Sequence, residues 1–169
     1  EIYNHKEIRI DLEKIGYQFN TDHSDTETII YAYEEWGIDA IHRFRGMFAI
    51  ALWDEKKDTL WLVRDRIGIK PLYYTIYKNK LYFASEIKAI LQDKSIPREF
   101  NEEGLYNYLS FLTVPAPQTL FKDIYKLPAG HRVKIQSGKV SNTEQYWDVF
   151  DNVENHNEKS DDEIRNELI

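Results

Sequence analysis

Apolar residues recur at helical spacing near the start of the chain. Residues 5–15 place isoleucine and leucine side chains on one helical face, and Gly16 can end that helix at positive φ. The run Ser24–Glu27 has the form of a capping box, because a hydroxyl at the cap is followed three residues later by a carboxylate. A second helix is therefore predicted from this cap to Gly37.

Short β-branched and aromatic runs follow, separated by polar turns. They span Met47–Trp53, Thr59–Val63, Leu72–Ile76 and Leu81–Phe83, and they predict an antiparallel meander. The first two runs are apolar at successive positions, so both faces of their strands should be covered. Helices are expected to lie over the sheet.

The second half of the chain continues this mixture of helix and strand. Helical patterns occupy Ser85–Leu91 and Asn101–Leu112, the latter with its asparagine as a cap. A final hairpin is predicted from His131–Ile135 and Lys139–Trp147. Residues 151–169 are polar and are interpreted as a linker followed by the start of another helix.

Composition narrows the class of protein. With 169 residues, 42% of them apolar, the chain can bury one sizeable core. A formal net charge of −7 and a pI near 5.3 disfavour nucleic acid as a partner. The apolar runs are too short to span a bilayer, so a cytoplasmic protein without a membrane partner is expected. There is no cysteine, and the five histidines lack metal-ligand spacing, so no metal site is expected.

Five segments carry a family resemblance. The run Arg64–Tyr74 contains R-D-x-x-G-x-x-P-L, and Glu1–Asn4, Ser24–Glu27, Arg45–Asp54 and Phe83–Ile90 accompany it in the same order. Together they resemble the class II glutamine amidotransferases, in the form seen in asparagine synthetases. Amidotransferases that make phosphoribosylamine share the first motif.

Three features favour the asparagine synthetase branch: Arg66, where the phosphoribosylamine-forming enzymes commonly have proline, and the runs Phe83–Glu86 and Pro128–His131. The resemblance implies an α+β, N-terminal-nucleophile hydrolase fold. Two stacked antiparallel sheets lie between helical layers (αββα), with the N-terminal strands absent from this sequence. Residues 1–150 would form the amidotransferase domain, incomplete at its N-terminus. Residues 151–169 would lead into a C-terminal synthetase domain outside the chain.

The resemblance also assigns roles to residues. Glu1 and Asp25 resemble the carboxylates that hold the α-amino group of glutamine, although Asp25 alone could be a helix-start residue that complements the dipole. The family nucleophile is an N-terminal cysteine, so no catalytic residue is expected in this chain, which should be inactive as given. Arg64, Asp65 and Gly68 are interpreted as structural, not catalytic.

The implied function is hydrolysis of glutamine to supply ammonia for ATP-dependent amidation of aspartate. ATP and magnesium would then belong to the synthetase domain, and this chain would hold no cofactor. Glutamine and that domain are the expected partners, and a homodimer stays open. Two alternatives remain at this point: a related amidotransferase with another acceptor, and a non-catalytic glutamine-binding or interaction module.

Overall fold

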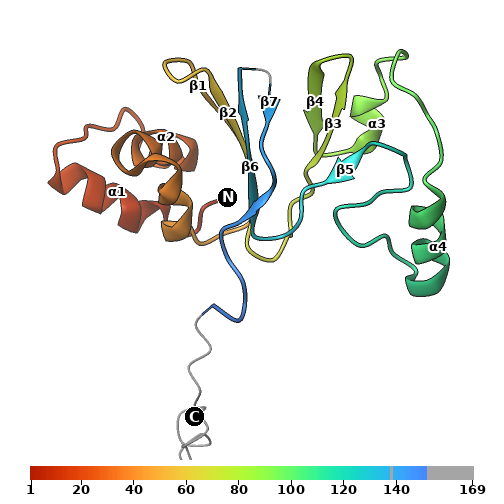
Figure 1. Cartoon of the computed structure of the whole chain (residues 1–169). Helices are drawn as coiled ribbons and strands as arrows, with labels where there is room; N and C mark the ends of the chain where they lie inside the picture. Colours follow the sequence, from red (N-terminus) through yellow and green to blue (C-terminus); the bar gives the residue numbers. More distant parts are fainter. Residues whose placement is uncertain (138, 152–169) are drawn as a thin grey trace, which may run out of the picture.

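A computed structural model describes residues 1–137 and 139–151 (Figure 1). In chain order the elements are α1 (His5–Lys14), α2 (Asp25–Trp36), the 3-10 helix η1 (Gly37–Arg43), β1 (Ala49–Asp54), β2 (Thr59–Arg64), β3 (Tyr73–Tyr77), β4 (Lys80–Ala84), α3 (Ile87–Ile90), α4 (Glu102–Phe111), β5 (Tyr125–Lys126), β6 (His131–Gln136), β7 (Lys139–Val140) and β8 (Glu144–Gln145). The linker and helix start predicted for 151–169 lie outside the described residues, except for Asp151.

Local signals set the limits of α2. The Ser24 hydroxyl caps the helix by accepting a hydrogen bond from the Glu27 amide at 3.2 Å, and Gly37 ends it at a φ of +64°. The second half of the predicted capping box is wrong. The Glu27 carboxylate accepts hydrogen bonds from the backbone amides of Asn20 (2.7 Å) and Thr21 (3.0 Å) instead. It thereby anchors the loop between α1 and α2.

The first sheet runs in the order β1-β2-β6-β7, and β8 also pairs with β6. Its strands are antiparallel, with Ile50 opposite Val63 and Leu62 opposite Val133. The predicted final hairpin is confirmed in outline. Its second arm, however, is divided into two short strands that pair with opposite ends of β6.

The second sheet runs in the order β4-β3-β5. The predicted four-stranded meander is therefore wrong, because β2 and β3 lie in different sheets. The chain turns away after β2 through Asp65 and Gly68, and β6 occupies the free edge of β2. Two separate hairpins, β1–β2 and β3–β4, replace the meander.

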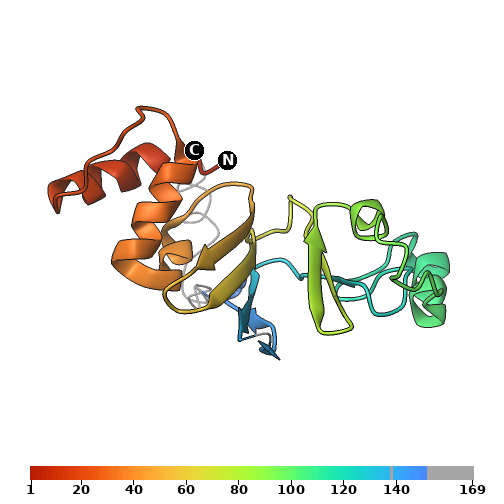
Figure 2. The same cartoon turned by 90° about the horizontal axis from the view of Figure 1, so that it is seen from above.

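Three apolar clusters divide the molecule into layers, visible from above in Figure 2. The first packs α1, α2 and η1 against the first sheet and includes Leu12 and Phe44. The second lies between the two sheets and includes Leu62 and Leu127. The third covers the second sheet with α3 and its flanking loop. This αββα arrangement confirms the predicted α+β class and the helical cover over the sheets.

The helix predicted at Asn101–Leu112 is confirmed as α4, and the Asn101 side chain accepts a hydrogen bond from the Gly104 amide at 3.1 Å. The stretch predicted at Ser85–Leu91 contains only the single turn of α3. None of the helices in residues 1–137 and 139–151 combines the length and apolar composition needed to cross a membrane.

Candidate functional site

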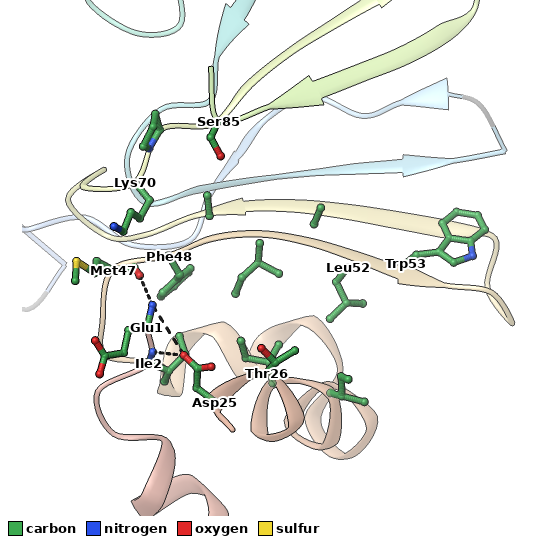
Figure 3. Close-up of a pocket in the computed structure, with 16 residues that line it drawn as sticks. Glu1, Ile2, Asp25, Thr26, Met47, Phe48, Leu52, Trp53, Lys70 and Ser85 are labelled. Atoms are coloured by element: carbon green, nitrogen blue, oxygen red, sulfur yellow. Dashed lines mark hydrogen bonds and ion pairs between the residues drawn. The ribbon is translucent and has the colours of Figure 1, made fainter. Parts of the chain in front are cut away.

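An open cleft of about 880 Å³ lies beside the N-terminal end of α2, over β1 (Figure 3). Its floor is the backbone and side chains of residues 47–53, and its helical wall is the first turns of α2. The segment that links β2 to β3 closes the far side. Polar or charged groups reach it from Glu1, Asp25, Thr26, Lys70 and Ser85.

Asp25 is the first residue of α2, and its side chain is about one-third exposed (32%). Its Oδ2 atom accepts a hydrogen bond from the Ile2 amide at 3.0 Å and lies 3.9 Å from the Glu1 backbone nitrogen. Its Oδ1 atom accepts no hydrogen bond from any residue that the structure describes. One carboxylate oxygen thus holds the N-terminal segment, while the other is available in the cleft.

Glu1 is fixed at the cleft by its backbone. Its nitrogen donates to the Met47 carbonyl at 2.8 Å, and Ile2 forms a bridge with Gly46. This approach is close: a Cβ at Gly46 would lie 2.2 Å from the Glu1 carbonyl oxygen. The Glu1 side chain is 67% exposed and points away from Asp25 in Figure 3. The structure therefore brings together Asp25 and the Glu1 backbone, but not the two carboxylates.

Lys70 and Ser85 line the opposite wall and were not expected from the sequence. Lys70 is the one lysine or arginine among the sixteen residues that line the cleft. A lysine on one wall of the cleft and the Asp25 carboxylate on another suit a zwitterionic ligand. The sequence gives no signal for Lys70, because its place in the cleft depends on how the turn between β2 and β3 folds.

Arg64 and Asp65 organise the turn beneath the cleft. The buried Asp65 carboxylate accepts hydrogen bonds from the amides of Phe48 (3.2 Å), Ile69 (2.9 Å) and Lys70 (2.9 Å). The Arg64 guanidinium donates to three backbone carbonyls, among them Leu127 at 2.7 Å. These groups are fully engaged with backbone, as expected of a structural turn.

Two further groups complete this turn. Gly68 has a φ of +69°, as predicted for its left-handed position. The Tyr146 hydroxyl donates to the Arg64 carbonyl at 2.8 Å. Burial, followed by the nearby Asp65 carboxylate, raises the pKa of Tyr146, so its hydroxyl stays protonated as a donor.

The cleft is equipped for binding and not, by its own side chains, for nucleophilic attack. Its lining offers carboxylates, one ammonium group and two hydroxyls, but no histidine to activate a hydroxyl. Within the described part of the chain, acidic and histidine side chains nowhere gather in the groups of three that a metal site needs. A small molecule with both an amino and a carboxylate group matches these residues.

Several known proteins are similar to this chain. The glutamine amidotransferase domain family matches residues 1–147. The glutamine-hydrolysing asparagine synthetase 1 of Bacillus subtilis is 37% identical over 99% of the chain, and asparagine synthetase 2 of the same organism is 41% identical over 89%. The chain spans 26% and 21% of these relatives' lengths, or about a quarter.

The fold also matches a solved structure. The glutamine phosphoribosylpyrophosphate amidotransferase of Bacillus subtilis aligns with 86% of this chain, which covers 27% of that protein, at a TM-score of 0.57 and 17% identity. At this identity the likeness bears on the fold alone. It confirms the predicted N-terminal-nucleophile hydrolase fold.

Proposed function

The chain belongs to the glutamine amidotransferase domain family, and from this premise we propose that it is the glutaminase part of a longer, glutamine-dependent asparagine synthetase. In that protein it supplies ammonia for the ATP-dependent amidation of aspartate. The relatives' names support this assignment of the reaction, and the residues of the cleft support glutamine as the ligand.

One observation carries the proposal: Asp25 presents an available carboxylate oxygen to a cleft with a lysine on its opposite wall. Free glutamine has an α-ammonium and an α-carboxylate, and each is best held by the opposite charge. Asp25 binds the ammonium group. Glu1 joins it through a rotation of its exposed side chain toward the cleft.

The remaining chemistry comes from outside these 169 residues. The chain contains no cysteine, so the thiolate that attacks the side-chain amide is supplied by other parts of the longer protein. On its own this chain binds glutamine but does not hydrolyse it. ATP and magnesium are used by the synthetase part, to which this domain supplies ammonia.

The test uses the full-length protein with Asp25→Asn. Asparagine retains an oxygen that can accept the hydrogen bond from the Ile2 amide, so the N-terminal segment stays in place. Loss of a charge-assisted hydrogen bond of about 1.5–3 kcal/mol should raise the KM for glutamine roughly 10- to 150-fold. Synthesis driven by added ammonia should be unchanged, which controls for damage to the synthetase part.

Two results would overturn the proposal. If the unaltered full-length protein released no glutamate from glutamine, it would not be a glutaminase. If Asp25→Asn left the KM for glutamine unchanged, Asp25 would act only as a helix-start residue that anchors Ile2.

A further inference from the structure

Helix α4 is attached to the body of the protein by its polar and small residues. The Asn101 side chain donates to the Thr119 carbonyl at 2.9 Å, and the Asn107 side chain donates to Gln118 Oε1 at 3.0 Å. Between them, Gly104 lies so close to the 118–119 loop that a Cβ would be 2.4 Å from the Thr119 oxygen. These three helix residues form the side that faces the domain.

A different side of α4 is apolar and faces solvent. Leu105, Tyr108 and Leu109 follow the i, i+3, i+4 spacing of one helical side, and Leu112, at i+7, caps the end of the helix. We call these four residues the α4 stripe. Leu109 is 71% exposed and Leu112 80%. Such a stripe normally lies against a core, and a ten-residue helix gains most of its stability from that packing. The described residues leave it uncovered.

A groove of about 260 Å³ adjoins the stripe. Tyr108 and Leu112 form one wall, and the other comes from the second sheet and the loops around it through Tyr73, Ile87 and Phe121. Tyr108 and Leu112 belong to both the stripe and the groove, whose lining also includes the polar side chains of Thr113, Gln118 and Lys126. Helix α4 lies on the outer flank of the molecule, on the same side as α3 and the second sheet (Figures 1 and 2). Surfaces of this kind mark sites of protein interaction.

We propose that the α4 stripe and its groove dock the polypeptide that follows residue 151 in the longer protein, through an apolar surface of the next domain. This proposal depends on the proposed function in one respect, namely that the chain is part of a longer protein. The relatives extend to about four to five times the matched length, so most of their polypeptide lies outside this domain. The last described residues and α4 project from the same end of the two sheets, the lower end in Figure 1.

Charge favours this occupant over a second copy of the chain. Each copy carries a formal net charge of −7, so two copies repel one another, while the α4 stripe itself has no charge to offset the repulsion. A covalently attached domain, in contrast, meets the surface at an effective concentration on the order of millimolar. Even weak apolar contacts then suffice to keep the domain on this surface.

Hydrogen exchange in the full-length protein, followed by mass spectrometry, tests the docking. Amides of residues 105–112 should exchange at least about tenfold more slowly in the unaltered protein than in Leu109→Glu, which puts a charge into the stripe. Glu103→Gln, on the same helix but outside the stripe, should exchange like the unaltered protein. Because Leu109 is exposed, amides of β2 and β6 should be unaffected by either change.

Two outcomes would overturn the inference. One is equally fast exchange of residues 105–112 in the unaltered protein and Leu109→Glu. The other is protection that grows with protein concentration, which would identify a second copy as the occupant. Glutaminase activity is measured separately: an active enzyme with an unprotected α4 refutes only the docking. An inactive enzyme whose α4 is protected independently of concentration refutes only the proposed function.

Discussion

Replacing Asp65 with asparagine should destabilise the fold strongly, because this carboxylate is completely buried and accepts three backbone hydrogen bonds. An asparagine side chain has a single acceptor oxygen. If that oxygen keeps the amides of Phe48 and Lys70, the new NH2 group faces the Ile69 amide, donor against donor. The loss is at least one hydrogen bond to a charged group, about 1.5–3 kcal/mol. The part-buried Ile69 amide, left unpaired, adds about 1 kcal/mol, the lower end of the cost for a buried group.

The expected destabilisation of Asp65→Asn is therefore about 2.5–4 kcal/mol in the free energy of unfolding. Urea unfolding followed by tryptophan fluorescence measures it, since the chain has four tryptophans. Asp11→Asn is the matched control: its side chain is 54% exposed, and its change should stay within about 0.5 kcal/mol. If Asp65→Asn unfolded like the unaltered chain but abolished glutaminase activity in the full-length protein, the structural role would be refuted in favour of a catalytic one.

Three further substitutions test other parts of the fold. Gly104→Ala should destabilise α4 although alanine favours helices, because its Cβ would lie 2.4 Å from the Thr119 carbonyl oxygen; a raised Tm would contradict this close approach. Hydrogen bonds from the Asn20 backbone and the neighbouring Thr21 lower the pKa of Glu27 to about 2. The stabilisation by the ionised Glu27 is thus present above the ordinary pKa of 4.5 and is lost as the pH falls toward 2. In urea unfolding, Glu27→Gln should therefore be less stable than the unaltered chain at pH 6, and the two should have similar stability near pH 2. Arg64→Lys should lower Tm despite retaining the charge, since an ammonium cannot span the carbonyls that the guanidinium joins; an unchanged Tm would show that charge alone matters.

The elements that the sequence predicts best are those set by neighbouring residues. Helix α2 is delimited by Ser24 and Gly37, and both signals act within a turn of the helix ends. The pairing of strands, in contrast, is not set by neighbouring residues. Strand β2 pairs with β6, far along the chain, and no feature of Thr59–Arg64 distinguishes that partner from the nearby β3. The error of the predicted meander comes from this non-local choice.

The same distinction applies to the site. Asp25 could be predicted because its place at the start of a helix agrees with an ordered family motif. Lys70 could not, because its position in the cleft depends on how the turn held by Asp65 carries it back over β1. The periodicity of α4 predicts a helix correctly, yet the outward direction of its apolar stripe depends on the loop to which Asn101 is bound.

The order of strands also bears on how the protein folds during synthesis. Strand β2 leaves the ribosome long before its partner β6, since Val63 pairs with Arg132, and the whole second sheet is synthesised between them. Pairing over such a distance requires closure of a long loop, which slows folding. Compact formation of the second sheet shortens that loop, because the Leu127 amide then donates to the Leu72 carbonyl at 2.9 Å and brings the two ends of the insert together. Early formation of the second sheet would therefore lower the entropic cost of pairing β2 with β6.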